Sequence, residues 1–173
     1  MPSVDLAALE GLELDARARR RIATYAQFAA LNLPLNLDAW DGYPACRERV
    51  HSMMKSYANN PVVLAGDTHN AWAFNMADAS GEAMGIELGT PGISSPGLES
   101  WLPIAPHMLS QLFKASSPEL HELNTSQRGW TKIDISDSEV RSAWRFVNNI
   151  LTSNYSVSES EPLVCRAGDR RFS

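Results

Sequence analysis

The residues best suited to chemistry in this 173-residue chain are Asp67 and His69, within the segment VVLAGDTHNAW (residues 62–72). In an extended backbone, residues two apart project to the same side, so this carboxylate and this imidazole can face one ligand. Carboxylate oxygen suits hard cations, and imidazole nitrogen suits borderline ones. The pair therefore predicts two ligands of a metal site. An Asx-turn at Asp67 beside a surface histidine is the structural alternative.

A short buried strand is expected to carry this pair. Residues 62–65 are apolar and include two β-branched valines, and they lie between Asn-Asn-Pro and Gly-Asp. This pattern is typical of a central strand that is buried on both faces. Gly66 allows a sharp turn after the strand, so that both side chains reach the edge of the sheet where the sites of α/β folds commonly lie.

The rest of the chain indicates a mixed α/β (α+β) fold with a substantial antiparallel part. Helices are expected at residues 5–30 (in one or two pieces, with Asp15 as an N-cap), from Pro44 to about Tyr57, and at 107–115. Strands are expected at 71–76, 83–88 and 120–123. Alternating apolar and polar residues predict two further strands at 129–135 and 139–148, joined as a hairpin around Ser136–Ser138. Residues 1–152 are expected to form one domain, and the Ser- and Glu-rich residues 153–173 a loose tail.

Composition restricts the function classes. The net charge of −5 and the isoelectric point near 5.3 argue against a nucleic-acid-binding surface, which needs clustered Lys and Arg. No apolar run is long enough to span a membrane, and residues 1–15 lack the basic and apolar regions of a signal peptide, so the compartment stays open. The basic run from Arg17 to Arg21 is interpreted as a solvated helix face, with a phosphate-attracting rim as the alternative.

Four segments together resemble, in order and spacing, the PhoD-type alkaline phosphatases, a branch of the calcineurin-like metallophosphoesterases. VVLAGDTHNAW resembles the GD-x-H-x-x-W segment of that family, and NLDAWDGYPACRERV (36–50) resembles its D-x-W-D-G-Y-P-x-x-R loop. GIELGTPGISSPGLES (85–100) resembles its Gly- and Ser-rich segment. TSQRGWTKIDISDSEVRSAWRFV (125–147) resembles its R-G-aromatic strand and the strand that follows. These segments extend over most of the chain.

The resemblance implies hydrolysis of phosphate esters at a two-metal centre that holds iron(III) and calcium, with other divalent metals as alternatives. Two such cations polarise the phosphoryl oxygens and lower the pKa of an attacking water. By this resemblance His69 contacts the iron, and Asp67 supplies oxygen to the calcium. The resemblance also implies that the chain forms the C-terminal portion of a β-sandwich flanked by helices. Members of the family are often exported.

The chain departs from the family because the upstream ligand motifs are missing before Val62. Asp38 and Asp41 belong to the WDGY loop, which is not a ligand motif of the family. Asp67 and His69 alone are fewer than the three protein ligands that a metal usually takes. We therefore expect half of a metal centre, in the C-terminal part of a longer enzyme, with an exposed edge on the strand that carries Asp67. The alternative is a non-catalytic remnant that oligomerises or pairs with a missing N-terminal half.

Several other residues have a functional and a structural interpretation. Asn70 is the candidate for a catalytic or substrate contact. Trp40 and Tyr43 are candidates to line the substrate cleft, and a loop pinned by aromatic stacking is the alternative. Trp72 is expected to pack in the interior. Arg128, beside a strand start, either pins a loop or is exposed.

Overall fold

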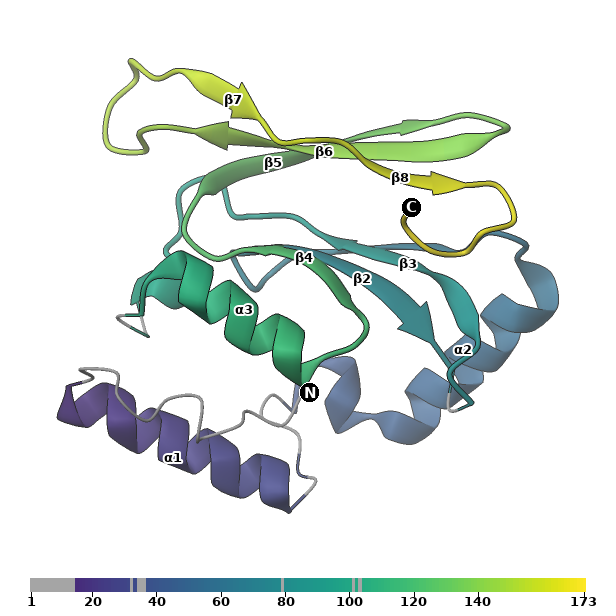
Figure 1. Ribbon diagram of the computed structural model, residues 1–173, viewed down its shortest axis with the longest axis horizontal. Helices are drawn as coiled ribbons and strands as arrows, with labels where there is room; N and C mark the ends of the chain where they lie inside the picture. The colour runs from purple at the N-terminus through teal and green to yellow at the C-terminus, as the bar shows by residue number, and fades with distance from the viewer. Residues whose placement is uncertain (1–14, 32, 34–36, 79, 101, 103) are drawn as a thin grey trace.

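The computed structural model describes residues 15–31, 33, 37–78, 80–100, 102 and 104–173 (Figure 1). Two four-stranded sheets face each other, and the helices of the described part lie on the outer side of one of them. This arrangement confirms the mixed α+β class. The part of the expected first helix at residues 5–14 lies outside the described residues.

The first sheet contains the strand that leads to Asp67 and His69. Its strands are β1 (Val62–Ala65), β2 (Ala71–Ala77), β3 (Ala83–Gly89) and β4 (Leu120–Asn124), in the order β1-β3-β2-β4. β1 runs parallel to β3, and the other pairs are antiparallel.

The expectation of a central strand at residues 62–65 is wrong. Within the described residues β1 pairs with β3 alone, so it is an edge strand, and Leu64 is 64% exposed. A short apolar segment can form either an edge strand or a central strand, and its amino-acid sequence does not distinguish the two. Among the described strands none pairs with the outer edge of β1, as was expected for this strand.

The second sheet is built around the long strand β6 (Glu139–Val147). β5 (Arg128–Ile135) pairs antiparallel with β6 along its whole length, as the expected hairpin requires. β7 (Val157–Glu159) and β8 (Leu163–Arg166) pair with the other side of β6.

The prediction of a loose tail at residues 153–173 is therefore wrong. Besides forming β7 and β8, this segment places Phe172 in the core at 5% exposure, and the backbone N–H of Phe172 donates a hydrogen bond to Asn75 Oδ1 (2.8 Å). Ser158 and Glu159, two of the residues that indicated a tail, lie on the exposed edge strand β7.

The main core lies between the two sheets. It consists of apolar side chains from β2, β3, β6, β8 and the C-terminal segment: Ala71, Ala73, Ile86, Leu88, Val140, Trp144, Phe146, Cys165 and Phe172. The alternate residues of β2 face the helices, where Trp72 stacks on Phe74 (ring centroids 5.7 Å apart) and meets the edge of Phe113 (5.6 Å). β2 is thus packed against other elements on both faces, and the expected packing role of Trp72 is confirmed.

The helices are α1 (Ala16–Ala30), α2 (Pro44–Tyr57) and α3 (Pro106–Ser116), with short 3-10 turns η2 (Trp40–Gly42) and η3 (Leu98–Ser100). Asp15 caps α1 as predicted, because its Oδ1 accepts a hydrogen bond from the N–H of Ala18 (2.7 Å). A second apolar cluster joins α1 to α3 and the segment before it, and contains Ile22, Leu102, Ile104 and Leu109.

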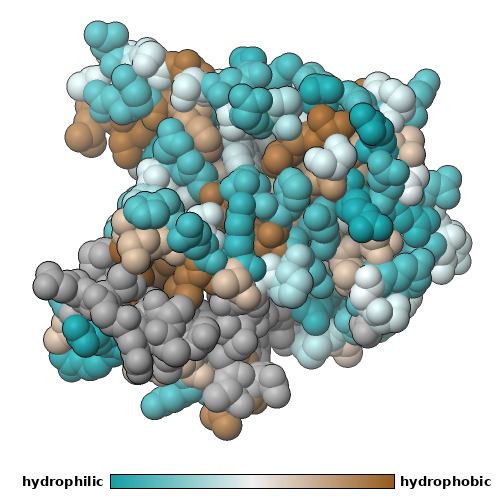
Figure 2. Space-filling model, in the orientation of Figure 1, coloured by the Kyte–Doolittle hydropathy of each residue, from teal (hydrophilic) through white to brown (hydrophobic). Residues whose placement is uncertain are grey.

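The face of the molecule in Figure 2 is mostly hydrophilic. An apolar patch at its upper left lies over the loop between β6 and β7, where Ile150 and Leu151 are exposed. Among the described helices, none has the length and apolar character needed to cross a membrane.

Candidate functional site

The turn that carries Asp67 and His69 crosses the end of β3. It leaves β1 beside Gly89 and enters β2 opposite the same residue. Asp67 and His69 both have positive φ, 68° and 57°, so the backbone here is left-handed and not extended. The prediction that both side chains project to the same side of an extended backbone is therefore wrong in its geometry. The sharp turn arises at Asp67 and His69, while Gly66 has no positive φ.

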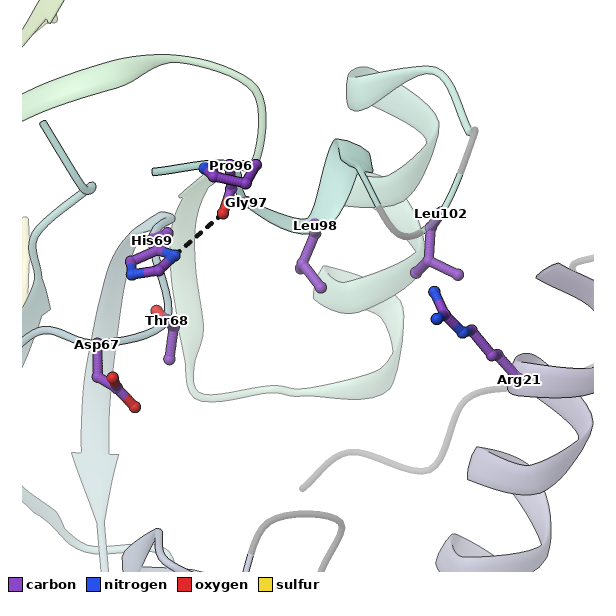
Figure 3. A pocket seen from close by; sticks show the side chains of 8 residues that line it. All are labelled: Arg21, Asp67, Thr68, His69, Pro96, Gly97, Leu98 and Leu102. Atoms are coloured by element: carbon purple, nitrogen blue, oxygen red, sulfur yellow. Dashed lines mark hydrogen bonds between the residues drawn. The ribbon is translucent and has the colours of Figure 1, made fainter. Parts of the chain in front are cut away.

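The two side chains nevertheless line the same pocket, of about 380 Å³ (Figure 3). Asp67 is exposed and His69 is half-buried. A volume of this size falls in the range of small-molecule sites. The pocket is lined by Arg21, Asp67, Thr68, His69, Pro96, Gly97, Leu98 and Leu102.

The imidazole of His69 is oriented by a backbone carbonyl. Its Nδ1 atom lies 3.0 Å from the carbonyl oxygen of Pro96 (Figure 3). A carbonyl oxygen only accepts, so Nδ1 carries the hydrogen in this bond, and in the neutral ring Nε2 keeps its lone pair. Metal-bound histidines are commonly fixed in this way, with the second ring nitrogen donating to a carbonyl or carboxylate. His69 therefore has the tautomer of an Nε2 ligand.

Asn70 belongs to the framework beneath the turn. Its side chain is 1% exposed, its Nδ2 donates to the carbonyl of Thr68, and its Oδ1 accepts from the N–H of Leu98 (3.1 Å). Gly97 permits this close approach, because a Cβ there would lie 2.5 Å from Asn70 Oδ1 and 2.7 Å from His69 O. Both ends of the Asn70 amide are thus used within the protein, which indicates a positioning role in place of a substrate contact.

Arg128 joins the turn to η3. Its side chain is buried, and its guanidinium donates to the carbonyls of His69 (3.1 Å) and Gln127 (2.8 Å) and forms an ion pair with Glu99. Of the two interpretations of Arg128, the loop-pinning one is confirmed.

Glu99 helps to hold this framework together through Arg128, and the sequence did not indicate it. Partial burial acts to raise the pKa of its carboxyl, but hydrogen bonds from Arg128 and from the N–H of Gly97 (3.1 Å) outweigh it and hold the pKa below its ordinary value. Glu99 and Arg128 are 29 residues apart. No spacing rule connects two such positions, and a Gly- and Ser-rich loop gives no periodicity from which the pairing could be found.

Trp40 and Tyr43 lie away from this pocket. They are 48% and 58% exposed, and neither is among the described residues that line it. The ring of Trp40 instead lies near His51, with centroids 6.3 Å apart. The geometry corresponds to the loop-pinning interpretation of Trp40. The side chain of Asp41 lies outside the described part.

The pocket offers side chains of types that bind metals, but two such ligands are fewer than a metal site usually has. Asp67 offers carboxylate oxygen, and His69 offers an oriented imidazole nitrogen. In the portion of the chain that the structure describes, no group of three or more His, Cys, Asp or Glu side chains is placed to hold an ion. Two donors can contribute to a centre but rarely complete one.

Comparison with known proteins now connects this site to a family. Residues 10–144 match the family model described as PhoD-like phosphatase. Alkaline phosphatase D of Bacillus subtilis (strain 168) is 45% identical over 67 residues, which are 36% of this chain and 12% of that protein. A solved structure described as "Structure of PhoD" superposes with a TM-score of 0.61 and 25% identity, covering 80% of this chain and 26% of that one.

The chain thus spans only a minor part of the length of either matched protein. The superposition shows that this chain shares its fold with part of the solved structure. The family match includes the turn with Asp67 and His69 and extends over well more than half of the residues. The chain belongs to the PhoD-like phosphatase family.

Proposed function

We propose that this chain contributes Asp67 and His69 to the metal centre of an enzyme that hydrolyses phosphate esters. The observation that carries the proposal is the hydrogen bond from His69 Nδ1 to the carbonyl of Pro96, which leaves Nε2 available to a metal. Membership of the PhoD-like phosphatase family supports it independently.

Iron(III) and calcium are the cations that we propose for this centre. The imidazole nitrogen of His69 suits the iron, and the hard carboxylate oxygen of Asp67 suits the calcium. Bound there, the cations would polarise the phosphoryl oxygens and lower the pKa of a water. The protein's own contribution is orientation: Pro96 fixes the ring of His69, while Arg128 and Asn70 hold the turn from below.

We further infer that the remaining ligands come from protein outside the described residues. Two donors are too few for a catalytic ion pair. Among the described strands β1 has no partner on its outer edge, directly before Asp67. This supports an adjacent segment that both extends the sheet and supplies ligands. On this proposal the chain is half of an active site.

Manganese(II) titration followed by NMR tests the metal proposal on the chain alone, because a paramagnetic ion broadens nearby amides even when it binds weakly. We expect selective broadening at residues 66–69 in the wild-type chain, and its loss in His69→Ala and in Asp67→Asn. His107→Ala is the matched control, since His107 is an exposed histidine in the first turn of α3. Broadening spread over surface carboxylates, or unchanged in His69→Ala, would refute the proposal.

The exposed edge of β1 also favours a second candidate function, a non-catalytic pairing module. An unpaired strand edge can add a strand from a second copy of the chain or from a missing N-terminal half. Leu64 on this strand is 64% exposed. Sedimentation of the purified chain, compared with a Leu64→Lys variant, tests this role. A dimer that Leu64→Lys weakens supports it, and a stable wild-type monomer that also binds no N-terminal fragment contradicts it.

A further inference from the structure

The pocket has a second wall that the metal proposal does not use, formed by Arg21, Leu98 and Leu102. Figure 3 shows Arg21 of α1 beside Leu102, on the side of the pocket away from Asp67 and His69, with Leu98 between the two groups. The wall therefore combines an apolar surface with one cationic end.

Packing holds Arg21 at this place. Its neighbour Ile22 is buried in the cluster that contains Leu102 and Leu109, so α1 is fixed against the segment that forms the wall. The other arginines of the basic run, Arg19 and Arg20 among them, are exposed. The structure thus separates Arg21 from the solvated helix face to which the sequence assigned the whole run.

We propose that this wall is the leaving-group subsite of the phosphoesterase centre, and that it favours esters whose leaving group joins an apolar stem to an anionic end. The proposal rests on the proposed function, because Asp67 and His69 define where the phosphoryl group lies. The stem packs on Leu98 and Leu102, and the anionic end pairs with Arg21.

The chemistry of the wall suits a leaving group better than the transferred phosphoryl group. Leucine side chains offer no hydrogen bonds, and a doubly charged phosphoryl group beside them would lose hydration without replacement. A hydrocarbon stem gains from the same contact. The planar guanidinium of Arg21 matches the two oxygens of a carboxylate or phosphate, so it selects for charge at the far end of the stem.

Three phenyl phosphates that differ only at the para position serve as probes: 4-methylphenyl phosphate, 4-carboxyphenyl phosphate and 1,4-phenylene bisphosphate. Their dissociation constants for the 173-residue chain are measured by NMR titration, for the wild type, Arg21→Gln and Arg20→Gln. Arg20 is the matched control, because it lies on the same helix and its Nε bonds to the carbonyl of Ala16 on the exposed surface (3.4 Å).

We expect at least one anionic probe to bind the wild type about fivefold more tightly than the methyl probe, the upper range of an exposed ion pair. Arg21→Gln removes this difference and Arg20→Gln retains it. The comparison between the carboxylate and the phosphate probe shows which anion the wall prefers. Equal binding of all three probes, no binding, or a preference that survives in Arg21→Gln overturns the proposal.

Repeating the titration with calcium separates this inference from the metal proposal. Calcium is expected to shift the amides of Asp67 and His69 in the wild type and in Arg21→Gln alike. Absence of the charge preference in the wild type, or its survival in Arg21→Gln, with those shifts intact refutes the leaving-group subsite alone. Absence of the calcium shifts in both proteins counts against the metal proposal.

Discussion

Arg128 and Glu99 form an ion pair beneath the turn that carries Asp67 and His69. The pair connects three segments, since Arg128 also donates to the carbonyl of His69 and Glu99 also accepts from the N–H of Gly97. The position of His69 therefore depends on two residues that do not line the pocket.

Arg128→Ala is expected to lower the free energy of unfolding by about 2 kcal/mol or more, because it removes the guanidinium that donates to the carbonyls of His69 and Gln127 and pairs with the Glu99 carboxylate. Denaturant titration measures the change. The control is Arg141→Ala, which removes an exposed ion pair with Glu139 and is expected to cost less than about 1 kcal/mol. Equal effects of the two substitutions would contradict the assigned role of Arg128.

Gly97→Ala is expected to destabilise the chain by about 1–3 kcal/mol and to shift the amide resonances of the 66–70 turn, because the added Cβ would lie 2.5 Å from Asn70 Oδ1. Gly66→Ala is the matched control in the same region. A Cβ at Gly66 would meet only Thr90 Cγ2 at 3.8 Å, an ordinary contact. If Gly66→Ala proves the more damaging substitution, the turn geometry described here is incorrect.

Asp67→Gly is expected to raise the free energy of unfolding by up to about 1 kcal/mol, because glycine adopts the left-handed φ of 68° without the cost that an L side chain carries. A carboxylate retained in this conformation is consistent with function taking precedence over stability. Asp134→Gly, within β5, should instead destabilise by about 0.5–1 kcal/mol. Destabilisation by Asp67→Gly of the same size would indicate that Asp67 is a structural residue.

Stability is expected to fall as the pH is lowered below about 6.5, because burial holds the pKa of His121 below its ordinary value. The ring of His121 stacks on Phe172, with centroids 5.0 Å apart. Between the lowered pKa of the folded state and the higher one of the unfolded state, the unfolded chain binds more protons, so acid favours unfolding. Thermal melts between pH 8 and pH 5 measure this loss, and His121→Gln should reduce it. An unchanged pH profile in His121→Gln would assign the loss to other groups.

The sequence was sufficient to predict the features that depend on local patterns. Asp15 caps α1, Pro44 begins α2, and the alternation around Ser136–Ser138 marks the β5–β6 hairpin. The pairing of Asp67 with His69 in one pocket was also predicted, although through an extended geometry that the left-handed backbone replaces.

Features that depend on distant partners could not be read from local patterns. β7 and β8 look like a polar tail because edge strands need few apolar residues, and only pairing with β6 makes them strands. The edge position of β1 depends on which strand adds to β3. The Arg128–Glu99 pair and the close approach at Gly97 require three-dimensional proximity that spacing alone does not give.

The nitrogen spectrum of the His69 imidazole tests the central claim most directly. Long-range ¹H–¹⁵N correlation distinguishes the two ring nitrogens, and His69→Ala assigns the signals. We predict that the hydrogen resides on Nδ1, bonded to the carbonyl of Pro96, and that zinc(II), a diamagnetic probe, shifts Nε2. A hydrogen on Nε2, or an Nε2 signal that zinc leaves unchanged, would contradict the account of His69 as a metal ligand.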